Sequence, residues 1–200
     1  MVRTYDMSKR AAAASETASR ITDATEKLLI SGPVGDVTLQ AIADGAAVTV
    51  QTVLRHMGSR DGCFEAVGVR LQARVDQQRG HTPPGDVDAA ICGLLDHYET
   101  DGRLVLNLLL QEGMDSPLAR EAAQQGRAYH RAWVERCFGP LLPDRRRGTV
   151  DALVAATDIS RQVRAAVRAL GDSEAKSRLL KQNRLEGILL SEAGGTVFAD

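Results

Sequence analysis

Hydrophobic residues recur with a helical period along almost the whole chain. Ile21, Ala24, Thr25, Leu28 and Leu29 fall on one face of a helix, at spacings of three and four residues. Similar apolar faces begin near residues 39, 53, 64, 87, 118, 150 and 179. No stretch shows the alternation of apolar and polar residues that is typical of a half-buried strand. The sequence therefore predicts an all-α fold of about nine helices.

Helix-ending and helix-capping residues divide the first half of the chain. Gly32-Pro33 should end the first helix, because glycine tolerates positive φ and proline cannot continue the hydrogen-bond ladder. Thr38 and Thr49 are suitable N-caps for two short helices, and Gly58 should end the second of them. A longer helix follows, up to the Pro- and Gly-rich stretch 81–86, which resembles a linker.

The second half of the chain predicts longer helices. A helix beginning at Val87 precedes the stretch 103–111, which is apolar on all sides except at Asn107 and is interpreted as a separate, central, buried helix. Ser116-Pro117 should start the next helix, with serine as N-cap and proline in the first turn. Two closing helices are expected at 150–170 and 179–190.

Composition and charge exclude several classes of protein. The chain has 200 residues, 44% of them hydrophobic and 26% charged, so wholesale disorder is excluded. The net charge of −1 leaves no general positive excess for coating nucleic acid or membranes. Three widely spaced cysteines indicate neither a disulfide framework nor a zinc site, and no cofactor motif is present. No apolar run reaches the ~20 residues of a membrane span. We expect a cytoplasmic protein.

The most informative stretch is residues 38–64. Two short helices joined by about four residues, with small residues at the joint, are typical of a helix-turn-helix, whose second helix enters the major groove. Ala43 and Ala46 are small enough for the two helices to cross closely, and Val53 can hold the second helix against the first. The pattern predicts a DNA-binding domain.

The second of these short helices carries candidate DNA contacts. Thr49, Gln51 and Thr52 place short hydrogen-bonding side chains at its N-terminal turn. Three basic or ionisable side chains can reach phosphates on either side: Arg55, His56 and Arg60. Residues 48–60 contain no acidic side chain, which gives a small, local electrostatic footprint suited to specific docking.

These residues resemble the TetR (tetracycline-repressor-like) family of one-component bacterial regulators. The matching stretches are Arg20–Ala24, Thr38–Ala43, Val48-Thr49, Thr52–Met57 and Ser59–Asp61, so the resemblance covers about 45 residues. It implies DNA contacts from Gln40, Val50, Gln51, Thr52, His56 and Arg60, with Thr49 as the cap of the recognition helix.

The chain departs from the family pattern at three positions. Ala47 stands in the turn where the family usually has glycine. Leu54 replaces the usual tyrosine, and Val50 stands where lysine is frequent. The last two departures remove two phosphate donors from the recognition helix.

The resemblance also implies the domain organisation. A helix-turn-helix domain over residues 16–62 would precede a ligand-binding and dimerisation domain over residues 63–200. The protein would be a homodimer through its two C-terminal helices, with candidate contacts at Leu153, Val154, Val167, Leu179, Leu180 and Leu190, although internal core is an equal alternative for each. It would repress by binding a pseudo-palindromic operator and be released by an unknown small-molecule effector.

The effector would bind among the central helices. Polar residues that interrupt apolar faces are the candidates: His97, Tyr98, Asn107, Gln111, Tyr129, Trp133 and Asp158. Asn107 is the strongest, because a buried amide needs partners. Tyr98, Tyr129 and Trp133 stand at core spacing, so packing with a satisfied polar tip is the alternative for them.

Two other classes of function remain as alternatives. An all-α small-molecule binding protein with a degenerate DNA-reading head would also fit the pattern, given Leu54 and Val50. A helical enzyme is disfavoured, because the chain has no recognisable catalytic constellation. Salt-dependent binding to a palindromic duplex would separate the regulator from both alternatives.

Overall fold

The computed structural model describes residues 7–110, 117–142 and 147–159. They contain seven α-helices and no strand, which confirms the all-α prediction. The helices are α1 (Met7–Ser31), α2 (Leu39–Gly45), α3 (Val50–Met57), α4 (Arg60–Val75), α5 (Val87–Leu110), α6 (Pro117–Phe138) and α7 (Arg147–Thr157). The last expected helix, near 179–190, lies outside the described residues. The chain divides into two compact units, residues 1–73 and 74–200, and the division falls within α4. None of the described helices is long and apolar enough to cross a membrane.

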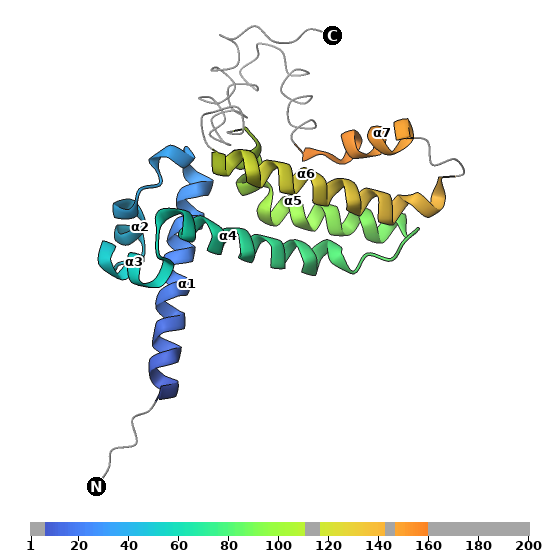
Figure 1. Ribbon diagram of the computed structural model, residues 1–200. Coiled ribbons are helices and arrows are strands. Elements are labelled where there is room, and N and C mark those ends of the chain that lie inside the picture. Colours follow the sequence, from blue (N-terminus) through green and yellow to red (C-terminus); the bar gives the residue numbers. More distant parts are fainter. Residues whose placement is uncertain (1–6, 111–116, 143–146, 160–200) are drawn as a thin grey trace, which may run out of the picture. The chain divides into compact units, whose positions relative to one another are not determined.

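In the first unit, α1, α2 and α3 pack against one another, coloured from blue to cyan in Figure 1. The face of α1 predicted from hydrophobic spacing is the buried one: Ile21 and Thr25 are fully buried. Ile42 of α2 and Val53 of α3 are also fully buried, and α1 packs against both of these helices. The single buried valine of α3 leaves its opposite face in solvent, which is the arrangement that a DNA-reading helix requires.

Local hydrogen bonds fix where the two short helices begin and end. The Thr38 hydroxyl accepts a hydrogen bond from the Ala41 amide, and the Thr49 hydroxyl accepts one from the Thr52 amide, each at 3.1 Å. Both predicted N-caps are therefore confirmed. Gly58 has φ of 75° directly after α3, a left-handed conformation that glycine adopts without steric cost, and it ends the helix as predicted.

The turn between α2 and α3 contains an alanine in the left-handed region. The Val48 amide donates to the Ala43 carbonyl at 3.0 Å, and the Ala47 amide donates to the Asp44 carbonyl at 3.2 Å. These two bonds form a Schellman motif, whose left-handed position usually holds glycine. Here that position is Ala47, with φ of 53°. The turn between the two helices is therefore made at the cost of backbone strain.

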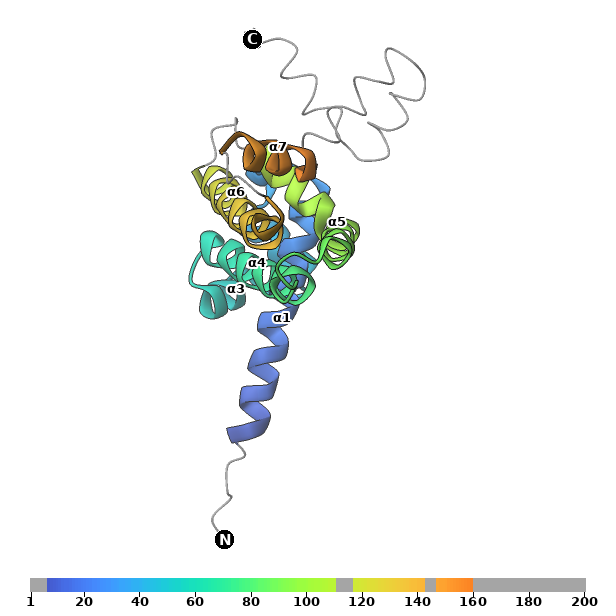
Figure 2. The same ribbon diagram turned by 90° about the vertical axis from the view of Figure 1, so that its right-hand side faces the viewer.

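In the second unit, α5 and α6 lie side by side and α7 packs along α6, as both views show (Figures 1 and 2). Its core consists of Ala90, Leu94, Trp133, Val134 and Cys137. Leu153 and Val154 of α7 are half-buried and pack against this core. Both residues therefore contribute to internal packing, and their role at a dimer surface stays a prediction. Val167, Leu179, Leu180 and Leu190 lie outside the described residues.

One sequence-based expectation in this unit is wrong. The stretch 103–111 does not form a separate helix, because α5 continues without a break through Asp101 and Gly102. Asp101 is buried there in an ion pair with Arg74.

The stretch 81–86 connects the turn after α4 to α5, as its proline and glycine residues predicted. The Gly85 amide donates to the Cys137 carbonyl at 2.7 Å, which fixes this loop to the end of α6.

The strained turn gives a direct test of the fold. Ala47→Gly should raise the free energy of unfolding by about 1 kcal/mol. The substitution removes the steric cost of left-handed alanine, about 1–2 kcal/mol. Part of this gain is lost because glycine makes the unfolded chain more flexible. The control is Ala73→Gly at an exposed position inside α4, which should lower the same quantity by about 0.5–1 kcal/mol. Urea denaturation measures both changes. Equal destabilisation by the two variants would contradict the strain at Ala47.

Candidate functional site

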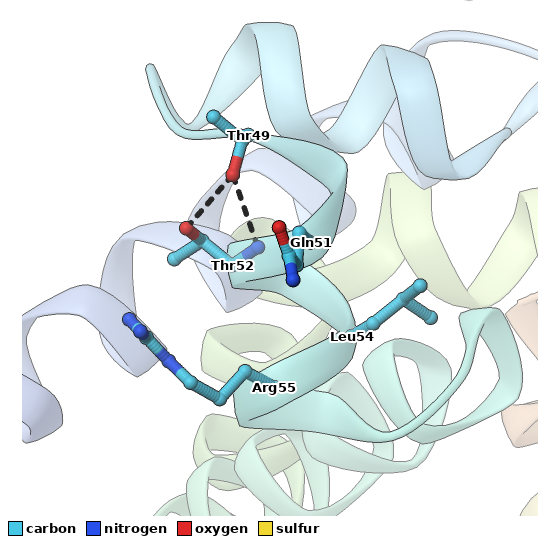
Figure 3. Close-up of a pocket in the computed structure, with 5 residues that line it drawn as sticks. All are labelled: Thr49, Gln51, Thr52, Leu54 and Arg55. Atoms are coloured by element: carbon cyan, nitrogen blue, oxygen red, sulfur yellow. Dashed lines mark hydrogen bonds between the residues drawn. The ribbon is translucent and has the colours of Figure 1, made fainter.

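The outward face of α3 carries a surface pocket. Its lining residues are Thr49, Gln51, Thr52, Leu54 and Arg55. Figure 3 shows these side chains projecting from one helix, with Leu54 and Arg55 directed away from each other. Four of the five were predicted as DNA-binding residues, so the structure brings those four together. Leu54 is the fifth member, and the sequence analysis considered it only as a departure from tyrosine.

The N-terminal turn of α3 is held by the threonine pair Thr49 and Thr52. Besides its bond to the Thr52 amide, the Thr49 hydroxyl lies 3.0 Å from the Thr52 hydroxyl, as the dashed lines in Figure 3 show. Because one hydroxyl of the pair donates and the other accepts, each keeps hydrogen-bonding capacity for an outside group. Gln51 between them is exposed and projects outward. This turn therefore presents uncharged donors and acceptors, which are the groups that read base edges.

The remaining predicted DNA contacts lie around this pocket without lining it. Val50 and His56 are half-buried on α3. Gln40 lies on α2, where its amide nitrogen donates to Asp44 at 2.8 Å, and its second N–H and its carbonyl oxygen remain for another contact. Arg60 begins α4, with its guanidinium carbon 5.3 Å from the centre of the Phe64 ring and its Nε 3.8 Å from the Asp61 carboxylate. Residues 48–60 contain Arg55 and Arg60 and no carboxylate.

Exposed apolar surface distinguishes this face from that of a purely polar recognition helix. Leu54 is 40% exposed, although it is one of the larger apolar side chains of the unit. A leucine at such a position can contact the methyl group of thymine or a sugar but cannot bind a phosphate. Its exposure agrees with the predicted burial of Val53, because neighbouring residues of a helix point about 100° apart.

The second unit contains a cluster of buried polar side chains centred on Arg79. This residue lies in a π-helical turn, η2 (Asp76–Gly80), that continues directly from α4, and it is only 3% exposed. Its guanidinium carbon lies 4.3 Å from the centre of the Trp133 ring and 5.5 Å from that of Tyr129. Both distances are within the range of cation–π contacts. Single π-helical turns often occur at functional sites.

Side chains of α6 and of the loop that follows this turn donate hydrogen bonds to the backbone of the turn. The Arg79 carbonyl accepts hydrogen bonds from the Trp133 indole at 3.2 Å, from the Thr82 hydroxyl at 2.9 Å and from Arg136 at 3.0 Å. Arg136 also donates to the Gly80 carbonyl at 2.8 Å. On the other side of the turn, Gly93 allows α5 to approach the turn closely, because a Cβ there would lie 2.5 Å from the Gln78 carbonyl oxygen. The position of Arg79 is thus fixed from both neighbouring helices.

A chain of hydrogen bonds runs from Arg79 to α7 through His130. One terminal nitrogen of Arg79 lies 3.0 Å from His130 Nδ1, and His130 Nε2 lies 2.9 Å from the Thr157 hydroxyl. A guanidinium can only donate, so Nδ1 must accept and the imidazole proton is on Nε2. The Thr157 hydroxyl accepts the hydrogen bond from this Nε2–H and donates a hydrogen bond of its own to the Leu153 carbonyl at 2.7 Å. The arrangement requires His130 to be neutral.

A second histidine borders the same cluster. His97 of α5, 4% exposed, lies 3.2 Å from the Gln78 amide oxygen and 3.6 Å from a carboxylate oxygen of Asp101. The other carboxylate oxygen of Asp101 accepts from Arg74 at 2.8 and 2.6 Å. Arg74 and Asp101 therefore compensate each other in charge.

Burial shifts the proton equilibria of this cluster. Loss of hydration, reinforced by the charge of Arg79, lowers the pKa of His97 and of His130 from 6.5 to about 4 each. Burial raises the pKa of Tyr98 to about 12, and the Tyr98 hydroxyl donates to the Thr157 carbonyl. Burial also lowers the pKa of the Arg79 guanidinium, which is still a cation at neutral pH.

Four of the predicted effector-binding residues belong to this cluster: His97, Tyr98, Tyr129 and Trp133. Asn107 is buried on α5, ten residues beyond His97. Asp158, half-buried just after α7, acts electrostatically on His130 and Tyr98. Gln111 lies outside the described residues.

Arg79, Asp101 and His130 were not predicted. The usable signal for His130 was an ionisable residue on an otherwise apolar helix face. Arg79 gave no such signal, because it stands in a polar stretch and its contact with His130 spans 51 residues.

Part of the first unit matches a known protein family. Residues 21–67 match the family model described as bacterial regulatory proteins, tetR family. This range includes α2, α3 and the turn between them. No curated protein matches the chain at a significant level of similarity.

The two neutral histidines predict a loss of stability in acid. Because the pKa of each is lower in the folded state than in the unfolded chain, the unfolded state binds more protons between pH 6.5 and about 4. The contribution is complete above pH 6.5 and is lost as the pH falls through this window. His130→Gln should reduce the slope of unfolding free energy against pH there by about one proton, about 1.4 kcal/mol per pH unit.

The fluorescence of Trp133, the one tryptophan of the chain, follows unfolding in urea at each pH. The control is His81→Gln, at an exposed position outside the cluster, which should keep the slope of the unmodified chain. An unchanged slope in His130→Gln would contradict a neutral, buried His130.

Proposed function

We propose that this chain, whose residues 21–67 match the tetR family of bacterial regulatory proteins, is a DNA-binding transcriptional regulator of that family and a ligand-responsive repressor. It binds a pseudo-palindromic operator as a homodimer and leaves the operator when a small-molecule effector binds. In this proposal the helix-turn-helix domain spans residues 16–62, and residues 63–200 bind the effector and form the dimer. The protein acts in the cytoplasm, by binding and without catalysis.

The observation that supports this proposal best is the outward face of α3. The helix is held on its inner side by Val53, its first turn is capped by Thr49, and its pocket presents Gln51, Thr52 and Arg55 to solvent. We assign base-edge contacts to Gln51 and Thr52, with apolar contact from Val50. Phosphate contacts are assigned to Gln40, Arg55, His56 and Arg60, since these residues surround the pocket on α2, α3 and α4.

The dimer explains how so small a surface could give specificity. Two recognition helices related by a two-fold axis bind half-sites about 34–36 Å apart, one turn of B-DNA. The expected contact helices near the C-terminus fall largely outside the described residues, so the dimer is proposed from the family. In it each subunit contributes the same short footprint, and the operator is symmetric for the same reason.

A second function is favoured by one specific observation. The exposed Leu54 and the half-buried Val50 stand where phosphate donors would strengthen binding. An all-α small-molecule binding protein with a degenerate DNA-reading head would have no need of such donors. DNA binding under physiological salt distinguishes the two functions, because a degenerate head would keep only weak, non-specific attraction.

Operator binding is tested by fluorescence anisotropy, with duplexes tiling the DNA upstream of the protein's own gene. We expect saturable binding to one duplex, and Gln51→Ala should weaken it by about 1–3 kcal/mol, or roughly 5- to 150-fold, because a base-edge contact is lost. The control is Gln125→Ala on α6, an exposed glutamine in the second unit, which should bind as the unmodified chain does. Absence of binding to every duplex would favour the second function.

The salt dependence of the same binding separates phosphate contacts from base contacts. Arg55→Ala should reduce the slope of log affinity against log salt concentration by about one per subunit, because one released counterion is lost. Gln51→Ala should leave that slope unchanged while it lowers affinity. The opposite pattern would exchange the roles assigned to these two side chains.

A further inference from the structure

Arg79 is buried, and among the described residues no carboxylate forms an ion pair with its guanidinium, whose partners are His130, Trp133 and Tyr129. Transfer of an ion out of water is costly, and cation–π contacts recover only part of the loss. A folded protein that keeps such a charge usually gives it a partner.

The other charges of the cluster do not provide that partner. Asp101 is paired with Arg74, and these two charges cancel. His97 and His130 add no charge at neutral pH. Asp76 is exposed and accepts a hydrogen bond from the Tyr129 hydroxyl at 3.0 Å. Asp158 acts electrostatically on His130 and Tyr98, but no ion pair within the described residues joins it to the Arg79 guanidinium.

One donor of the guanidinium is also unused. Nε of Arg79 is buried and has no hydrogen-bond partner within the described part of the chain. Nε–H and a neighbouring terminal N–H form the fork that a carboxylate binds through both of its oxygens. The terminal nitrogen that bonds His130 keeps a second proton for such a contact.

The residues around this fork are mostly aromatic. Trp133 is 2% exposed, and Phe138 packs edge-on against it at a centroid distance of 6.0 Å. Tyr98 and Tyr129 are part of the same packing, with their hydroxyls already engaged by Thr157 and Asp76. A ligand whose charged group met the fork would therefore have the rest of its structure among apolar rings, and this environment favours an apolar ligand body.

We propose that Arg79 is the anion-binding group of an effector site and that the effector is a monoanionic organic acid with an apolar body. Its carboxylate pairs with the Arg79 fork and supplies the missing charge, and its body lies among the aromatic residues of α5 and α6. One carboxylate compensates the one guanidinium, whereas a dianion such as phosphate would bury an unpaired charge in turn. The inference rests on the proposed function only in calling this ligand the effector.

Binding is tested on the full chain at pH 7, without DNA. Benzoate and cyclohexanecarboxylate are titrated at constant ionic strength and followed by Trp133 fluorescence and by calorimetry. Their neutral amides, benzamide and cyclohexanecarboxamide, keep the shape and lack the charge. We expect saturable binding of at least one acid, and at least tenfold weaker binding of its amide.

Three variants identify the residue responsible. Arg79→Met should weaken binding of the acid at least tenfold and remove its preference over the amide. Arg79→Lys keeps a charge without the fork, so it should retain the preference with weaker binding, and it serves if the methionine variant does not fold. The control is Arg131→Gln, an exposed arginine on α6 paired with Asp151, which should bind the acid as the unmodified chain does.

The proposal is overturned if neither acid saturates, if the amides bind equally well, if chloride or phosphate produces the same response, or if Arg79→Met binds the acid normally. A separate measurement concerns the proposed function: addition of the bound acid to an operator complex followed by anisotropy. Acid binding without release from DNA would leave the site intact and remove its role as effector site. DNA binding without acid binding would overturn the anion site at Arg79 and leave the proposed function standing.

Discussion

The burial of the Arg79 guanidinium against Trp133 is the interaction on which the second unit depends. The carbonyl of the same residue accepts bonds from Trp133, Thr82 and Arg136, so both the backbone and the side chain are held by one stretch of α6 and the loop before α5. The neutral state of His130 follows, because a protonated Nδ1 would place two donors face to face. A single buried cation thus determines the turn, the tautomer and the polar contacts around it.

A different constraint governs the first unit. There the helices are short, and an eight-residue helix such as α3 is marginal without tertiary contacts. Val53 supplies the buried contact, Thr49 satisfies the first turn and Gly58 ends the last one. All stabilisation lies on the inner face or at the ends, so the outer face is free to vary with the DNA sequence it reads. This separation explains how Leu54 and Val50 can depart from the family pattern without disturbing the fold.

The sequence predicted best what is local. The caps at Thr38 and Thr49 and the stop at Gly58 depend on bonds within three or four residues, and each was found where predicted. The ion pair of Asp101 could not be predicted, because its partner Arg74 lies 27 residues away along the chain. Arg79 was missed for the same reason. A basic residue after a helix reads as solvated until its distant aromatic neighbours are known.

The two units are joined through α4, which begins beside α3 in sequence and continues into the π-helical turn that holds Arg79. A ligand can change the state of a protein only through unequal affinity for two states. An uncompensated cation gives such inequality directly, because a carboxylate binds best to a conformation in which the Arg79 fork can reach both of its oxygens. In the described conformation His130 also bonds Thr157 at the end of α7. Charge compensation at Arg79 would therefore favour the conformation of the second unit that keeps the π-helical turn and the contacts of His130 between α6 and α7.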